Sequence, residues 1–71
     1  MTAAPVPTIA EIDARLAELG WTDLEVQIDA VDDVTVFVTR SDAPSLRLVA
    51  TGTDVHTARL RVLRHAEEIN R

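Results

Sequence analysis

Two stretches of alternating apolar and polar residues, separated by only three residues, constrain the fold of this chain more than any other feature. The apolar positions are Leu24, Val26, Ile28 and Ala30 in the first stretch and Val34, Val36 and Val38 in the second. A period of two places such a set on one face of a β-strand. The short separation predicts an antiparallel hairpin whose apolar side chains form one buried surface.

The register of this hairpin is limited by the same alternation. The apolar sets share a face only if the numbers of paired residues sum to an even value. Pairing Ile28 with Val36 meets this condition and leaves a three-residue loop of Val31, Asp32 and Asp33. We expect Asp33 to adopt the left-handed conformation, which aspartate tolerates better than most residues.

An amphipathic helix is predicted before the hairpin. Thr8 and Glu11 have the spacing of a T-x-x-E capping box, in which each side chain bonds the backbone N–H of the other. The apolar stripe that follows consists of Ile9, Ile12, Leu16 and Leu19. Gly20 can end the helix in the left-handed conformation, with Trp21 packed against Leu16 as a clamp.

A third strand and a second helix are predicted after the hairpin. The strand covers residues 46–51, with Leu46, Leu48 and Ala50 on its apolar face, and Gly52 ends it. Thr53 or Asp54 then caps the helix. Its apolar stripe consists of Val55, Ala58, Val62, Ala66 and Ile69, and Leu60 and Leu63 widen it.

The order of helix, three-strand meander and helix predicts a two-layer α+β domain. Both helices need a partner for their apolar stripes, and we expect both to pack on the apolar face of a three-stranded antiparallel sheet. The domain covers residues 8–71 and follows a flexible N-terminal lead of residues 1–7, which contains two prolines.

The composition gives no indication of catalysis or of a bound cofactor. The chain has no cysteine, and its two serines lie in one turn, so no nucleophilic triad is indicated. His56 and His65 are nine residues apart, about half a turn out of phase on a helix, and do not form a metal pair. We therefore expect a non-enzymatic protein without metal or cofactor.

Location and origin follow from the same composition. No apolar run reaches the roughly 20 residues of a membrane span, and the N-terminus does not resemble a signal peptide. A cytoplasmic protein that does not bind membranes is expected. Seven arginines without any lysine suggest coding by a high-GC bacterium or one of its phages.

Charge is distributed unevenly along the chain. Residues 1–33 contain eight carboxylates and one arginine, a net charge of −7, whereas residues 34–71 contain four carboxylates and six arginines, a net charge of +2. An asymmetry of this kind is informative about binding partners rather than about the fold.

The segment Ala50-Thr51-Gly52-Thr53-Asp54-Val55-His56-Thr57-Ala58-Arg59 resembles the G-x-G-x-S-K-K-x-A-K segment of double-stranded-RNA-binding domains. These domains also share the helix, three strands, helix order. The resemblance implies that the second helix meets phosphates. Val55 and His56, however, occupy the positions of the family's lysine pair, and Asp32 and Asp33 lie in the loop that would enter an RNA groove. We therefore expect no useful binding of double-stranded RNA.

Two candidate surfaces follow from these patterns. The first is an apolar contact for another protein, or for a second copy in a homodimer, formed by Phe37 and Val49 on the open sheet face or by Leu60 and Leu63 on the last helix. The second belongs to the alternative function of nucleic-acid binding and consists of His56, Arg59, Arg61, Arg64 and Arg71. We favour a small protein-interaction module, of the kind a phage uses as an accessory protein acting on a host or viral protein.

Overall fold

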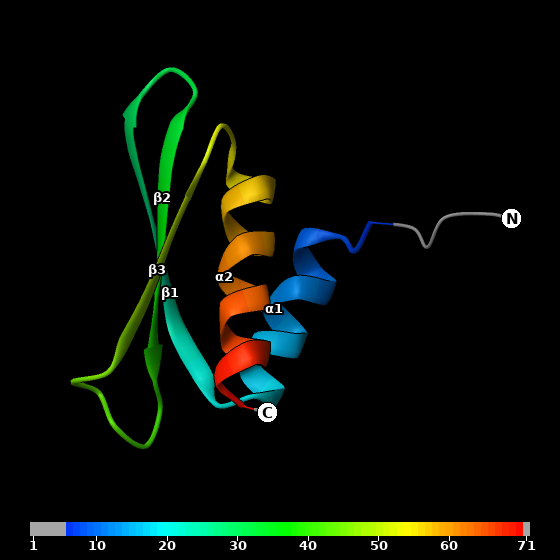
Figure 1. The fold of residues 1–71 in the computed structure, drawn as a ribbon, viewed down its shortest axis with the longest axis vertical. Helices are drawn as coiled ribbons and strands as arrows, with labels where there is room; N and C mark the ends of the chain where they lie inside the picture. The colour runs from blue at the N-terminus through cyan, green and yellow to red at the C-terminus, as the bar shows by residue number, and fades with distance from the viewer. Residues whose placement is uncertain (1–5, 71) are drawn as a thin grey trace, which may run out of the picture.

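The structure is a computed structural model that describes residues 6–70 of the chain. Its elements are α1 (Ile9–Glu18), β1 (Trp21–Ala30), β2 (Asp33–Arg40), β3 (Arg47–Gly52) and α2 (Val55–Ile69). The strands form one antiparallel sheet in the order β1-β2-β3, and both helices lie on the same side of it (Figure 1). The predicted α+β class and α-β-β-β-α order are confirmed. Of the predicted lead-in, residues 1–5 lie outside the described residues.

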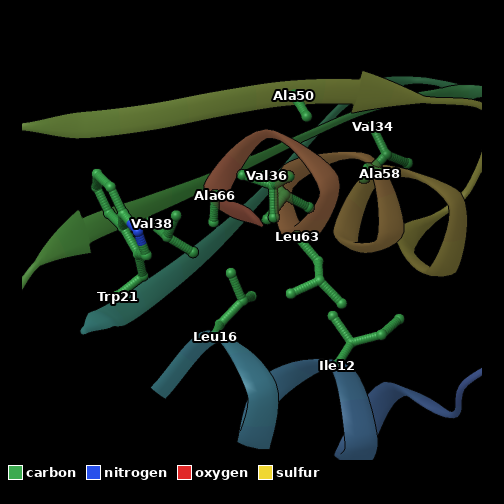
Figure 2. Packing of buried hydrophobic residues seen from close by; sticks show 11 residues of the cluster. Ile12, Leu16, Trp21, Val34, Val36, Val38, Ala50, Ala58, Leu63 and Ala66 are labelled. Carbon is green, nitrogen blue, oxygen red and sulfur yellow. The ribbon is translucent and has the colours of Figure 1, made fainter. Parts of the chain in front are cut away.

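The core lies between the sheet and the helices (Figure 2). α2 packs across β2 and β3, and α1 packs against α2 and β1. The buried apolar residues are Ile12, Leu16, Trp21, Val34, Val36, Val38, Ala50, Ala58, Val62, Leu63 and Ala66. Ala58 and Ala66 of α2 are fully buried, and α2 approaches β3 closely where Ala58 lies beside Gly52.

Both helices begin at the predicted type of cap. In α1 the Glu11 backbone N–H donates to the Thr8 hydroxyl at 3.2 Å, and the Thr8 N–H donates to the Glu11 carboxylate at 3.0 Å. In α2 the cap is Asp54, whose carboxylate accepts from the Thr57 N–H at 2.7 Å. The capping box is thus confirmed, and Asp54 rather than Thr53 caps the second helix.

The Asp54 cap makes the stability of the protein depend on pH under acidic conditions. Hydrogen bonds from the backbone N–H of Thr57, and then from its hydroxyl, lower the pKa of Asp54 below its ordinary value. A lowered pKa in the folded state contributes stability above the unfolded-state pKa, near pH 4, and this stability is lost as the pH falls through the folded-state pKa. We expect Asp54→Asn, which keeps a capping oxygen, to reduce the loss of stability between about pH 5 and pH 2. Urea melts across this range measure the effect, with Glu68→Gln as the control; an unchanged pH slope in Asp54→Asn would contradict it.

The predicted hairpin register is wrong by two residues. Ile28 pairs with Val34 and Val26 with Val36, and Ala30 lies opposite Asp33. The turn is therefore tighter than the predicted three-residue loop, and Asp32, with φ of 63°, takes the left-handed conformation instead of Asp33. Because a shift of two residues keeps every side chain on its original face, the apolar sets still share the helix side.

β1 begins three residues earlier than the alternation suggested. Gly20 has a φ of 89°, and its N–H donates to the Ala17 carbonyl at 3.0 Å, so it ends α1 as predicted. Trp21 opens the strand opposite Arg40. A register shift between Thr22 and Glu25, with Asp23 at a φ of 53°, inserts an extra residue. This bulge allows Trp21 and Leu24, at positions of opposite parity, to line the same pocket.

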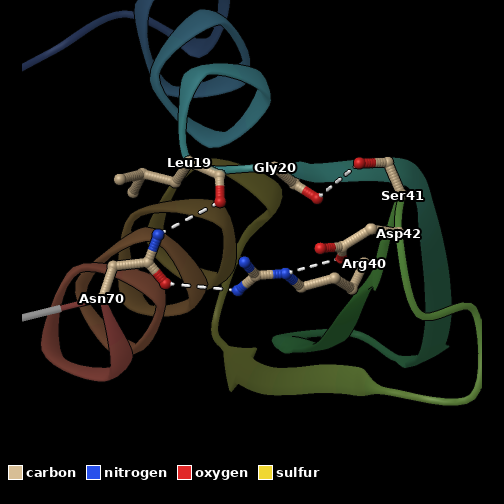
Figure 3. A network of polar contacts seen from close by, with 6 residues as sticks. All are labelled: Leu19, Gly20, Arg40, Ser41, Asp42 and Asn70. Atoms are coloured by element: carbon tan, nitrogen blue, oxygen red, sulfur yellow. Dashed lines mark hydrogen bonds and ion pairs between the residues drawn. The ribbon is translucent and has the colours of Figure 1, made fainter.

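A polar network joins the ends of the two helices to the β2–β3 loop (Figure 3). The Asn70 side chain, at the end of α2, donates to the Leu19 carbonyl at 3.1 Å. Arg40 donates to Asp42 at 2.9 Å and to the Asn70 side-chain oxygen at 3.4 Å. Arg40 also lies over the Trp21 ring, 5.4 Å from its centroid. These contacts fix the end of the molecule where α1, α2 and β1 meet.

Candidate interaction surface

The helix side of β1 carries an exposed row of apolar side chains. Val26 and Ile28 pair with buried valines of β2 and so face the helices, yet they are 39% and 69% exposed. Leu24, which is the closest of the three to the start of β1, is half-buried. We call Leu24, Val26 and Ile28 the exposed row. The prediction that the first strand is half-buried through this face is therefore wrong beyond Leu24.

The row is exposed because α1 is too short to cover it and α2 lies over the other two strands. At about 1.5 Å per residue, the 10 residues of α1 span roughly 15 Å, whereas the 10 residues of β1 span roughly 33 Å. Leu16 of α1 lines one pocket with Trp21 and Leu24 at the start of β1, and α2 lies on β2 and β3. Val26 and Ile28, farther along β1, stay exposed.

A pocket of about 170 Å³ lies at the Leu24 end of the exposed row. It is lined by Asp13 and Leu16 of α1, Trp21 and Leu24 of β1, and Val38 of β2. Its volume is below the 300–1,000 Å³ of typical small-molecule sites and suits a single side chain. The indole nitrogen of Trp21 is buried and has no hydrogen-bond partner among the described residues. Leu24 belongs to both the pocket and the row, so the two features are continuous.

β1 is also an edge strand with an acidic character. All six residues from Glu25 to Ala30 are exposed. No arginine or histidine occurs between Arg15 and Arg40, whereas the hairpin contains five carboxylates: Asp23, Glu25, Asp29, Asp32 and Asp33. Among residues 6–70 none of these five forms an ion pair. The edge therefore combines apolar side chains on one face with negative charge that is not neutralised.

The predicted surface on the open face of the sheet is smaller than the sequence suggested. Phe37 lies between Glu25 and Val49 of the neighbouring strands. It is half-buried, and the Arg47 guanidinium lies 5.5 Å from its ring centroid. Val49 is 45% exposed. The arginine covers part of the ring, so the apolar area available here is limited.

The alternative apolar contact, Leu60 and Leu63 on α2, is mostly buried. Leu63 lies in the core and is 6% exposed, and Leu60 is partly buried against the core. The structure does not bring them together with Phe37 and Val49, because α2 and the open face lie on opposite sides of the sheet. Their place in the core is the reason why the apolar face of α2 is wider than one stripe.

The candidate nucleic-acid contacts are largely engaged within the molecule. Arg59 donates to the Asp13 carboxylate at 2.6 Å and its side chain is 16% exposed. A ring nitrogen of His56 lies 2.7 Å from the Pro7 carbonyl oxygen, and Arg61 donates to the Thr51 carbonyl at 2.9 Å. Arg64 is exposed, and Arg71 lies outside the described residues. Of the four predicted contacts that lie within residues 6–70, three are therefore bonded to other atoms of the molecule.

Residues 6–70 contain neither a cluster of metal-ligating side chains nor a membrane-spanning helix. No group of three or more histidine, aspartate or glutamate side chains in this range is arranged to hold a metal ion. Neither of the described helices is long and apolar enough to cross a membrane.

Comparison with known proteins identifies no relative. No family model matches the chain, and neither the curated proteins nor the solved structures contain a significant match.

Proposed function

We propose that this protein is a small, non-catalytic interaction module that binds another protein through the exposed row of β1. The observation that carries the proposal is the exposure of Ile28, 69%, on the same face that buries Val34 and Val36. An isolated exposed aliphatic residue is ordinary, but this one continues a row that leads into an apolar pocket. The exposed row and the pocket together offer a partner protein a contiguous apolar surface.

The arginines and histidine of α2 argue against the alternative of nucleic-acid binding. The resemblance to double-stranded-RNA-binding domains extends over the order of the elements, but Arg59 is neutralised by Asp13 at 2.6 Å. Asp32 lies in the turn between β1 and β2 and Asp33 begins β2, and both would repel phosphates. A cytoplasmic accessory role, in which the module recognises a protein partner, fits this charge distribution better.

The proposal predicts that capture of a partner depends on Ile28. Immobilised protein would be incubated with an extract of cells that encode it, and bound proteins quantified by mass spectrometry. Ile28→Ser should reduce specific capture at least about fivefold, since it removes more than 1 kcal/mol of apolar contact. Leu46→Ser is the matched control, because Leu46 is 54% exposed but lies in the β2–β3 loop.

Equal capture by wild type and Ile28→Ser would overturn the proposal. So would tight binding to nucleic acid. Titration of the protein into an RNA duplex at physiological salt should give a Kd no lower than that of non-specific binding to DNA, about 10⁻⁴ to 10⁻⁶ M. Submicromolar binding that depends on duplex length would instead establish the nucleic-acid function.

A further inference from the structure

Resting on the proposed function, we propose that the partner supplies an extended segment of alternating basic and aliphatic residues, which pairs with the free edge of β1 as a fourth strand. Three features of β1 determine the chemistry of this partner segment: its open edge, the exposed row on one face, and the carboxylates on the other face.

The edge of β1 is open to strand addition. β1 pairs with β2 on one side only, because the sheet order is β1-β2-β3. An edge strand presents a row of unpaired backbone N–H and C=O groups, and adding a strand satisfies them. The stretch Glu25–Ala30 is exposed throughout, so a segment of about six residues could pair with it without displacing any described part of the chain.

The helix side of this edge requires aliphatic side chains. In an added strand, alternate side chains lie on the same face about 7 Å apart, the same spacing as that of Leu24, Val26 and Ile28. Aliphatic residues at these positions would contact Val26 and Ile28, which are 39% and 69% exposed. The residue nearest Leu24 would lie at the pocket of about 170 Å³, which can accept one such side chain.

The open face of the same edge requires basic side chains. Glu25 and Gln27 pair with Phe37 and Thr35 on this face, and Asp29 accepts a hydrogen bond from Thr35 at 3.2 Å. Neither Glu25 nor Asp29 forms an ion pair among the described residues. Lysine or arginine directly opposite would form favourable cross-strand pairs.

A second copy of this chain fits the edge poorly. Antiparallel pairing of β1 with its own copy would bring the Glu25 and Asp29 carboxylates of both copies onto one face, and like charges opposite each other are destabilising. Pairing of β1 with β3 of another copy would leave one edge free at each end and would form open chains rather than a closed dimer. A different protein with a basic segment is therefore the occupant.

A peptide titration tests the proposal. The probe is a capped heptapeptide of alternating lysine and valine, added to the ¹⁵N-labelled full chain at low salt. We expect saturable amide shifts confined to β1 and the rim of the pocket, with a Kd below about 1 mM. The same peptide N-methylated at every residue keeps its charge and apolar side chains but has no backbone N–H to donate at either edge, and it should not bind. A glutamate–valine heptapeptide should not bind either.

Matched substitutions locate the contact. Val26→Thr should weaken binding of the lysine–valine peptide about fivefold. Val49→Thr is the same change at a similarly exposed position on the open face, and it should not affect binding. Glu25→Lys should weaken it about fivefold or more, whereas Glu68→Lys on α2 should leave it within twofold.

The outcomes separate this inference from the proposed function. Absence of binding, equal binding of the N-methylated or glutamate–valine peptide, or a concentration-dependent homodimer that uses the β1 edge would each overturn the basic-strand proposal. If the peptide fails while capture from the extract still depends on Ile28, the interaction module stands and only its partner chemistry is wrong.

Discussion

Leu16→Ala is expected to destabilise the protein by about 2–5 kcal/mol, because it leaves a cavity at the contact between α1 and the rest of the core. Leu16 is 2% exposed and projects from α1 toward the sheet and α2 (Figure 2). α1 buries only one other side chain, Ile12, so the substitution removes about half of its anchoring surface. A chain of 71 residues has a total stability of about 4–10 kcal/mol. The variant should therefore lose from about a fifth to all of this stability.

Thermal melts monitored by circular dichroism measure this effect. At 4–8 °C per kcal/mol for a domain of this size, we expect Tm to fall by at least about 8 °C. Leu46→Ala makes the same chemical change at a side chain that is 54% exposed, and it should stay within about 0.5 kcal/mol of wild type. Similar losses in the two variants would mean that α1 does not pack on the core as described.

The elements themselves could be predicted because each has a local signal. The capping box of Thr8 and Glu11, the left-handed Gly20 and the Asp54 cap all depend on residues within three or four positions of one another. Alternation in β1 and β2 likewise assigns each side chain to a face. These signals determine what kind of element forms and where it stops.

The register of the hairpin could not be predicted from the same signals. Pairing Ile28 with Val34 and pairing it with Val36 place identical residues on identical faces, so alternation does not distinguish them. The tight turn with Asp32 at a φ of 63° decides between them. Two adjacent aspartates offer the left-handed position equally well, and only the structure shows which one takes it.

The exposure of the row could not be predicted from alternation, because alternation shows which way a side chain points and not whether another element covers it. Val26 and Ile28 point toward the helices as predicted, but whether a helix lies above them depends on element lengths. The comparison of α1, roughly 15 Å long, with β1, roughly 33 Å, carries that information. Helix lengths estimated from the apolar stripes would have revealed the shortfall. The opposite error, treating Leu63 as surface, arose from assuming a narrow buried stripe on α2.

Gly52→Ala is expected to destabilise the protein by about 1–3 kcal/mol through overpacking. A Cβ atom at Gly52 would lie 2.8 Å from the Ala58 backbone nitrogen and 3.2 Å from the Ala58 Cα. These atoms belong to the backbone of α2 and cannot rotate away, so the end of β3 and the first turn of α2 would have to separate. That separation would also disturb Val34, which pairs with Gly52 and is 5% exposed.

Gly20 provides the contrasting case that isolates this mechanism. A Cβ atom there meets nothing closer than 3.8 Å, but the φ of 89° is unfavourable for residues with a side chain. Asparagine tolerates the left-handed region better than alanine, so Gly20→Asn should be more stable than Gly20→Ala. At Gly52 the order should reverse, because the larger asparagine adds to the clash. Urea melts of the four variants measure both orders. Tolerance of alanine at Gly52, or the same order at both sites, would show that close approach of α2 to β3 does not hold these elements together.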